Sequence, residues 1–211
     1  SSVLGGRGIR ILDRENKMSK WVIDKQFSFC YGHRVWTQKL VEEFCESGDT
    51  CCKCRHLHGH EGLVHVFLEG DTLERGMVTD FKHLGWLKNF LDKLVDHKFI
   101  IDSHDPMFGQ LVDNVYKDLS GKTSPTFKDV HVPGTNHIAG RELDLSAVAH
   151  LATTPDYEVL EGYFIVDYTP TSENLCKWLY DCTQAKMSKL GIKVAQIDWY
   201  ETPKSRSSYR G

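Results

Sequence analysis

The amino-acid sequence predicts an α+β protein built on a mainly antiparallel sheet. Two observations indicate this class: apolar residues recur at strand spacing near the start of the chain, and at helical spacing in two later segments. The expected order is strand, strand, helix, strand, helix, strand, which is typical of α+β proteins. With 211 residues, 40% of them hydrophobic, the chain is long enough to bury a substantial core.

The first two strands are expected before residue 70. Apolar residues stand at four of the five odd positions from Trp21 to Phe29, with mostly polar ones between them, and this period of two indicates a half-buried strand. Residues 63–68, enclosed by Gly62 and Gly70, form a short run that is apolar on both faces, so we expect a second strand there.

Two helices and two further strands are expected downstream. Asp80 stands at an N-cap position, and the apolar residues after it predict an amphipathic helix that ends near Leu94. A third strand is expected at residues 163–166. Thr171 is the next expected N-cap and Gly191 the stop of that helix, after which residues 192–200 form the last expected strand.

Composition excludes several classes of protein. The chain has 26 Lys and Arg against 29 Asp and Glu, so it lacks the basic excess of a nucleic-acid-binding protein. It also lacks the apolar run of roughly 18 residues that a membrane span requires. Its 7 cysteines are odd in number and unevenly spaced, which favours reduced thiols and a cytoplasmic location.

We expect one domain with a leader and an insertion. Residues 1–18 are interpreted as a leader, tag-derived or disordered, and residues 19–211 as a single domain. Residues 103–160 contain four prolines and interrupt the strand–helix pattern, so they are expected to be a long insertion. We expect it to decorate the outside of the assembly; the equal alternative is that it covers the pocket and alters the substrate. The default interpretation of its histidines is surface polar residues: His104, His131, His137 and His150.

Three histidines suggest a metal centre. His58 and His60 are two apart on an extended segment, so their imidazoles project from the same face, with Gly59 removing bulk between them. His33 closes the first strand, and pairing of the two strands would bring it alongside. Three neutral imidazoles suit Zn²⁺ and leave a fourth position for water or substrate, as in catalytic zinc sites.

Two alternatives stay open for these residues. A His-x-His pair on a strand is more often a hydrogen-bonded surface pair than a metal site. The second alternative is a structural zinc site with Cys45, Cys51, Cys54 and His58 as ligands, since Cys51-x-x-Cys54 has ligand spacing. The remaining cysteines are interpreted as small core residues: Cys30, Cys176 and Cys182.

Six motifs occur along the chain in the order of a known family: His33 after a Phe-rich strand, Cys54-x-x-x-His58-Gly-His60, Met77–Phe81, Val95-Asp96-His97, Pro170–Leu175 and Glu201-Thr202. With them the chain resembles the 6-pyruvoyltetrahydropterin synthase / 6-carboxytetrahydropterin synthase family over residues 19–102 and 162–211. The resemblance implies a tunnelling fold, in which a four-stranded antiparallel sheet carries two helices on one face. It also implies trimers that stack into a homo-hexamer, with active sites between subunits.

The resemblance further implies the reaction. The family acts on 7,8-dihydroneopterin triphosphate. One branch eliminates triphosphate to form the pyruvoyl product, and the other also releases acetaldehyde and forms 6-carboxy-5,6,7,8-tetrahydropterin for queuosine synthesis. Cys54, four residues before His58, fits the carboxy branch, which we favour, whereas Cys52 at six residues fits the longer gap of the pyruvoyl branch. A non-catalytic, zinc-stabilised binding module is the third alternative.

The resemblance assigns catalytic roles to three residues beside the zinc ligands His33, His58 and His60. Cys54 is implied to be the general base, because a nearby cation favours the reactive thiolate form. Asp96 and His97 are implied to be an acid–base pair. The alternative for His97 is a favourable interaction with the carboxyl end of the preceding helix.

The resemblance also assigns the pterin-binding residues. Glu201 is implied to anchor the ring, because a carboxylate accepts two adjacent N–H groups. A second polar group is implied at Thr171, Ser172 and Glu173, where helix capping is a compatible interpretation. The triphosphate candidates are basic residues near the motifs: Arg34, Lys53 and Arg55.

Overall fold

The computed structural model describes residues 19–45 and 52–211, so the expected leader, residues 1–18, lies outside the described residues. The strands are β1 (Trp21–His33), β2 (His58–Gly70), β3 (Lys98–Asp102), β4 (Phe127–His131), β5 (Ile138–Leu143), β6 (Tyr163–Val166), β7 (Lys193–Thr202) and β8 (Ser205–Tyr209). The α-helices are α1 (Gly85–Leu94), α2 (Asn114–Ser120), α3 (Pro155–Glu161) and α4 (Ser172–Met187).

The strands form one eight-stranded sheet in the order β4-β5-β6-β3-β1-β2-β7-β8. Pairing is antiparallel except between β1 and β3 and between β3 and β6, which are parallel. The α+β class is therefore confirmed, but the expected four-stranded sheet is wrong. A contiguous antiparallel block of β1, β2, β7 and β8 is present, and β3, β6, β5 and β4 extend it at the β1 edge.

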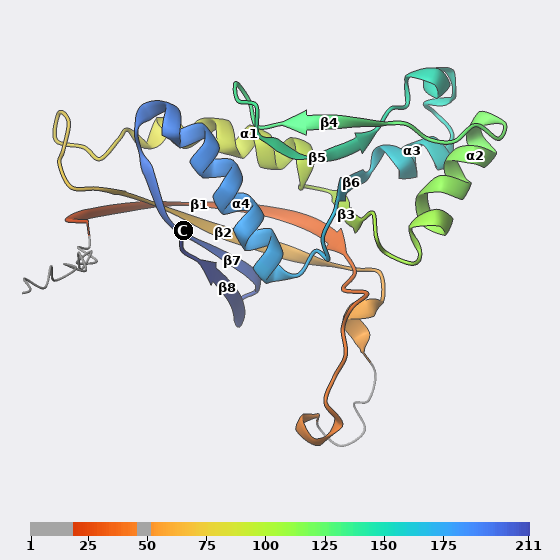
Figure 1. Cartoon of the computed structure of the whole chain (residues 1–211), viewed down its shortest axis with the longest axis horizontal. Coiled ribbons are helices and arrows are strands. Elements are labelled where there is room, and N and C mark those ends of the chain that lie inside the picture. The colour runs from red at the N-terminus through yellow and green to blue at the C-terminus, as the bar shows by residue number, and fades with distance from the viewer. Residues whose placement is uncertain (1–18, 46–51) are drawn as a thin grey trace, which may run out of the picture.

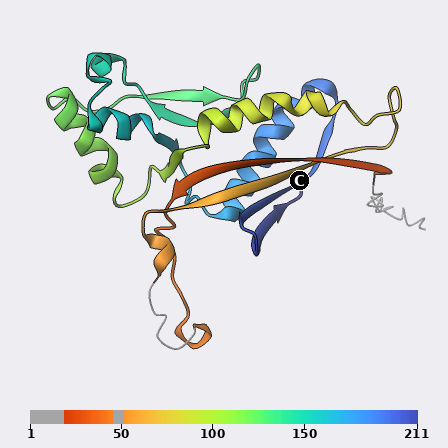
Figure 2. The ribbon, with the colours of Figure 1, turned by 180° about the vertical axis from the view of Figure 1, so that it is seen from behind.

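The insertion is part of the sheet, which the sequence analysis did not predict. It supplies β4 and β5, and β5 pairs with β6 through Arg141 and Ile165. Its helices α2 and α3 gather at one end of the molecule in both ribbon views (Figures 1 and 2). They cover a second cluster of buried residues that includes Ile101, Leu160 and Ile165.

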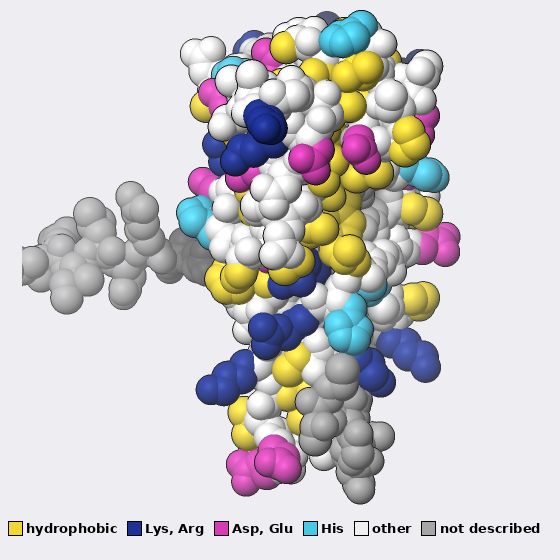
Figure 3. All heavy atoms as spheres, turned by 90° about the vertical axis from the view of Figure 1, so that its right-hand side faces the viewer, with side chains coloured by type: hydrophobic (Ala, Val, Ile, Leu, Met, Phe, Trp, Pro, Cys, Tyr) yellow, Lys and Arg dark blue, Asp and Glu magenta, His cyan; other side chains and the backbone are white. Residues whose placement is uncertain are grey.

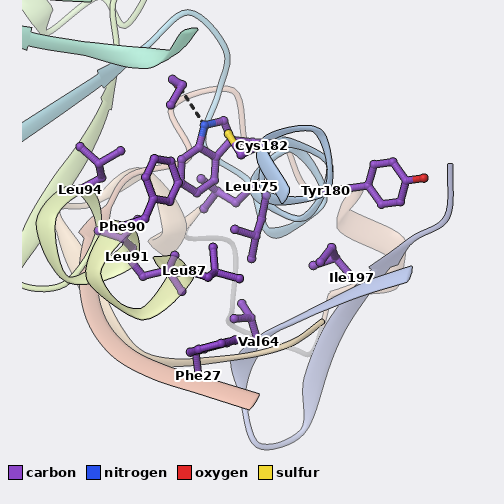
Figure 4. Packing of buried hydrophobic residues seen from close by; sticks show 14 of the residues in the cluster. Phe27, Val64, Leu87, Phe90, Leu91, Leu94, Leu175, Tyr180, Cys182 and Ile197 are labelled. Atoms are coloured by element: carbon purple, nitrogen blue, oxygen red, sulfur yellow. Dashed lines mark hydrogen bonds between the residues drawn. The ribbon is translucent and has the colours of Figure 1, made fainter. Parts of the chain in front are cut away.

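The main core lies between the sheet and the helices α1 and α4. Alternate residues of β1 and β2, such as Phe27 and Val64, face this core because successive side chains of a strand point to opposite faces. Figure 4 shows Phe27 and Val64 below Leu87 and Leu91 of α1, with Leu175 of α4 in the same cluster. Both helices therefore lie on one face of the sheet, as the resemblance implies.

Several expected elements match the structure. The third strand, residues 163–166, is β6, and the helix after Thr171 is α4, with Gly191 in the left-handed conformation beyond its end. Asp80 accepts a hydrogen bond from the Lys82 N–H and caps a 3-10 helix, Phe81–Leu84, that precedes α1. No helix in the described part of the chain is both long and apolar enough to cross a membrane.

Strand β1 ends at His33, as expected, whereas β2 begins at His58 and is longer than expected, and this positions the site. They pair along their whole length, so the last residue of β1, His33, lies opposite the first residue of β2, His58. The described residues between them, 34–45 and 52–57, project away from the sheet (Figures 1 and 2).

Candidate functional site

The antiparallel pairing of β1 and β2 brings the three predicted metal ligands together. His33 lies opposite His58, and His60 lies opposite Tyr31. The ring centroids of His33, His58 and His60 are 4.6 to 5.1 Å apart. One nitrogen of each ring lies within 4.8 Å of the others, the only such group of His, Cys, Asp or Glu within residues 19–45 and 52–211.

Two of the three rings are oriented by main-chain carbonyl groups. The Nδ1 atom of His33 lies 2.7 Å from the carbonyl oxygen of Pro170, and Nδ1 of His58 lies 2.7 Å from that of His56. Since a carbonyl oxygen only accepts, each Nδ1 carries the proton, and Nε2 is left to bind a cation. The Nε2 atoms of His33 and His60 lie 3.1 Å apart, an arrangement of nitrogen donors that fits a divalent metal ion.

The surroundings of the rings favour neutral, fixed imidazoles. His33 is fully buried, and Tyr31 contacts the rings of both His33 and His60. Burial lowers the pKa of His60, which favours its neutral, metal-binding form. A Cβ atom on Gly59 would lie 2.9 Å from the Tyr31 carbonyl oxygen, so this position requires glycine for the strands to approach.

Glu201, at the carboxyl end of β7, lies against the same rings. Its Oε1 atom is 3.3 Å from Nε2 of His33 and 3.4 Å from Nε2 of His60. The residue implied to anchor the pterin therefore lies next to the histidine cluster.

Asp96 and His97 form a contacting pair at the edge of β1. Nδ1 of His97 lies 3.0 Å from Oδ2 of Asp96, and the imidazole is 81% exposed. Asp96 Oδ1 accepts a hydrogen bond from the Cys30 N–H, and this bond lowers the pKa of the Asp96 carboxyl. His97 has a left-handed backbone and donates its own N–H to the Cys30 carbonyl oxygen. Asp96 thus has a structural role as well as its contact with His97.

Cys54 lies in a 3-10 helix, Lys53–Arg55, just before β2. It is not part of the three-histidine group. Of the alternative zinc ligands, Cys51 lies outside the described residues, and neither Cys45 nor Cys54 shares a group with His58. The described part of the chain therefore gives no support to the structural zinc site.

The start of α4 lies beside the histidine cluster, because the carbonyl oxygen of Pro170 contacts His33. Thr171 accepts a hydrogen bond from the Asn174 N–H and so caps α4, as expected. The Ser172 hydroxyl lies 2.7 Å from that of Ser207 in β8, and Glu173 is exposed. Thr171 is therefore held by the helix cap and Ser172 by β8.

A cavity of about 750 Å³ is lined by residues of the site and of the insertion. His58, His60 and His97 line it together with Glu158 and Val159 of α3. Figure 3 views the end of the molecule where the insertion lies above residues 34–45 and 52–57, and hydrophobic side chains form a band down its middle. The insertion therefore contributes to the surface beside the candidate metal ligands.

Sequence reasoning missed the residues that support the site. Tyr31 lies in the period-two pattern of β1, and this pattern predicts that its side chain faces the core. Its contact with His33 and His60 depends on the register of β1 with β2, which the pattern does not give. The ion pair of Arg34 with Asp105 and the bond of Trp36 to Asp102 join segments distant in sequence. No local pattern in the sequence indicates such pairs.

Comparison with known proteins identifies relatives along nearly the whole chain. The family model described as 6-pyruvoyl tetrahydropterin synthase matches residues 22–211. The 6-carboxy-5,6,7,8-tetrahydropterin synthase of Aquifex aeolicus (strain VF5) is 30% identical over 201 residues, covering 90% of this chain and 98% of the relative. A protein of the same name from Synechocystis sp. is 36% identical over 92 residues, 39% of this chain and 60% of the relative.

A solved structure shares the overall fold. The crystal structure of the uncharacterized protein WS1659 from Wolinella succinogenes is 40% identical in sequence, with a TM-score of 0.76. The match covers 90% of this chain and 98% of that one, a span that includes the insertion. The fold described above is therefore similar to that of a solved structure over most of the chain.

Proposed function

Because this chain belongs to the 6-pyruvoyl tetrahydropterin synthase family and is a carbon–oxygen lyase, we propose that it is a zinc-dependent 6-carboxytetrahydropterin synthase. The proposed reaction converts 7,8-dihydroneopterin triphosphate to 6-carboxy-5,6,7,8-tetrahydropterin with release of acetaldehyde and triphosphate. The product would serve queuosine and 7-deazaguanine synthesis. The names of the Aquifex and Synechocystis relatives favour the carboxy branch.

The observation on which this proposal depends is the convergence of three imidazoles with two fixed tautomers. His33, His58 and His60 would hold the metal ion through nitrogen atoms that lie within 4.8 Å of one another. When bound there, zinc would act as a Lewis acid and stabilise the negative charge that develops on a substrate oxygen. Three protein ligands leave a coordination position for the substrate, as in catalytic zinc sites.

The chain's own residues supply the proton transfers and the recognition of the substrate. Cys54 is proposed to remove a proton from the substrate side chain, and the Asp96–His97 pair to exchange protons with it. The Asp96 carboxylate, 3.0 Å from the His97 ring, stabilises the protonated imidazole that such an exchange requires. Glu201 is proposed to accept the two adjacent N–H groups of the pterin ring.

The polar side chains at the start of α4 are proposed as the second pterin-binding group. Pro170, which orients His33, immediately precedes Thr171, so the helix cap lies next to the metal ligands. Ser172 and Glu173 follow in the first turn of α4, where their side chains contact each other at 3.3 Å. A pterin held by Glu201 would then meet hydroxyl groups and a second carboxylate at this helix start.

The proposed active form is a homo-oligomer, a hexamer made of two trimers. Cys54 does not line the cavity that His97 lines in the described part of one copy. A neighbouring copy that contributes its own Asp96 and His97 would complete the set of catalytic groups.

The products test the proposal. Incubation of the zinc-loaded protein with 7,8-dihydroneopterin triphosphate should release acetaldehyde and triphosphate in equal amounts. Release of triphosphate without acetaldehyde would instead support the pyruvoyl branch, which the six-residue spacing of Cys52 and His58 favours. Absence of both products would refute the lyase assignment to this substrate.

A further inference from the structure

Two buried carboxylates, one at the end of β3 and one at the start of the insertion, contact the segment that follows His33, a proposed metal ligand. Asp102, at the end of β3, is 2% exposed, and its Oδ2 atom accepts a hydrogen bond of 2.9 Å from Nε1 of Trp36. Asp105 is 4% exposed, and its Oδ2 atom lies 2.7 Å from Nε of Arg34. Buried carboxylates are costly to leave unpaired, so these contacts are strongly favoured.

Both carboxylates are themselves fixed by the backbone of the insertion. Asp102 Oδ1 accepts a hydrogen bond from the His104 N–H at 2.9 Å, and Asp105 Oδ1 accepts one from the Met107 N–H at 2.8 Å. The Ser103 N–H donates to the Val166 carbonyl oxygen, which ties the turn to β6. A turn that is anchored in the sheet therefore places the Asp105 carboxylate against the charge of Arg34 and the Asp102 acceptor against Trp36.

We call the contacts of Asp102 with Trp36 and of Asp105 with Arg34 the clamp. The segment that the clamp fixes in turn holds the backbone of Cys54. Val35, between Arg34 and Trp36, donates its N–H to the Cys54 carbonyl oxygen at 2.6 Å. The side-chain oxygen of Gln38 accepts a hydrogen bond of 2.9 Å from the Cys54 N–H. Both main-chain polar groups of Cys54 are thus bound by the segment that Asp102 and Asp105 fix.

We propose that residues 102–105, where β3 meets the insertion, position Cys54: Asp102 and Asp105 are positioning residues that act through Arg34, Trp36 and Val35. The inference rests on the proposed function in taking Cys54 as the general base. It assigns to residues 102–105 a role in catalysis without contact with the substrate. A displacement of about 1 Å at a reacting group can cost on the order of a hundredfold in rate, so loss of the clamp reduces turnover.

Trp36→Phe tests the proposal, with Trp86→Phe as the matched control. Trp36→Phe removes the indole N–H that Asp102 accepts and keeps an aromatic ring, whereas Nε1 of Trp86 has no hydrogen-bond partner among the described residues. We expect kcat of Trp36→Phe to fall by roughly ten- to a hundredfold with KM and zinc content unchanged. Trp86→Phe should keep the kcat of the unmodified chain.

A second readout is independent of turnover. The rate of iodoacetamide alkylation at Cys54, measured by mass spectrometry relative to Cys30, reports the position of the thiol. Cys30 is exposed and not the core residue that the sequence analysis expected. Trp36→Phe should change this ratio and Trp86→Phe should not. If the unmodified chain shows no turnover, the proposed function fails, and this ratio alone decides whether the clamp positions Cys54.

Asp102→Asn, which weakens the same clamp, should change kcat and the alkylation ratio in the same direction as Trp36→Phe. Its control is Asp144→Asn. Like Asp102, Asp144 accepts a hydrogen bond from the main-chain N–H two residues later, that of Ser146, and it lies within the insertion. The proposal is overturned if Trp36→Phe and Asp102→Asn match their controls in both readouts. It is also overturned if kcat falls only in proportion to unfolding, with the alkylation ratio unchanged.

Discussion

The imidazoles of the candidate metal centre are held by their neighbours as much as by the strands. Tyr31 lies against His33 and His60 with ring centroids 5.2 and 5.6 Å away. Its hydroxyl accepts a hydrogen bond from Nε1 of the fully buried Trp199. Contacts of this kind limit ring rotation, so the nitrogen donors are already oriented before a metal ion binds.

His60→Ala tests the metal centre, with His65→Ala as its control. Both histidines lie on β2, but His65 is outside the three-histidine group and its Nδ1 lies 3.9 Å from Asp24. His60→Ala should lose most of the bound zinc and the activity, whereas His65→Ala should keep both, as measured by elemental analysis after dialysis. Equal zinc content in the two variants would refute the assignment of His60 as a ligand.

The identity of the general base is tested by comparing Cys54→Ala with Cys52→Ala. Loss of a general base lowers turnover by roughly a hundredfold or more, so we expect this effect for Cys54→Ala with the zinc content kept. Cys52→Ala should remain active. The reverse result would transfer the role to Cys52 and would favour the spacing of the pyruvoyl branch.

Asp96 gives a prediction for the pH dependence of stability. Because the Cys30 N–H lowers the pKa of Asp96 in the folded state, the carboxylate stabilises the fold above its unfolded value of about 3.9. This contribution is lost as the pH falls through the lower, folded value. Asp96→Asn removes it at all pH values, while its amide oxygen still accepts the Cys30 N–H.

The measurement is the midpoint of urea unfolding for the unmodified chain and for Asp96→Asn at several pH values. The unmodified chain should be the more stable of the two at about pH 6, and the difference should shrink as the pH falls below about 4. A difference that is constant with pH would show that the carboxyl has the same pKa in the folded and unfolded states.

Among the elements, α4 connects the core to the site. Its inner face is fully buried at Leu175 and Leu179, and its first turn lies beside Pro170, which contacts His33. The sequence predicts this helix well because a capping Thr171, apolar spacing and a terminal Gly191 all agree. Packing of α4 on the sheet therefore also fixes one side of the candidate metal centre.

Leu179→Ala and Leu190→Ala form a matched pair that tests this packing. Leu179 is fully buried, so its truncation should lower the free energy of unfolding by about 2–5 kcal/mol. Leu190, just beyond α4, is 52% exposed and should change the stability by less than about 0.5 kcal/mol. Similar urea midpoints for the two variants would contradict the described core.

The strands that sequence reasoning missed have weak local patterns. β3 (Lys98–Asp102) is only five residues long and begins directly after the turn that ends α1, and β8 (Ser205–Tyr209) is almost entirely polar. Both are stabilised by neighbours distant in sequence, since β3 pairs with β1 and β6, and β8 pairs with β7. Such strands depend on tertiary contacts rather than on their own periodicity.

At the scale of the whole molecule, the insertion links the sheet to the candidate site. Sequence reasoning did not predict the strands within residues 103–160, because prolines and turns mask short pairing segments. It extends the sheet through β4 and β5 and contributes α3 to the cavity beside His58 and His60. The three-histidine cluster was predictable because it depends only on the pairing of β1 with β2 and on the two-residue spacing of His58 and His60. The clamp at Asp102 and Asp105 depends on the whole fold.

The most direct test of the metal centre is a crystal structure of the zinc-loaded protein with anomalous scattering measured at the zinc absorption edge. We predict one strong anomalous peak between the Nε2 atoms of His33, His58 and His60. A peak at the cysteines of residues 45–54, or none at the histidines, would contradict this assignment and the proposed lyase mechanism with it.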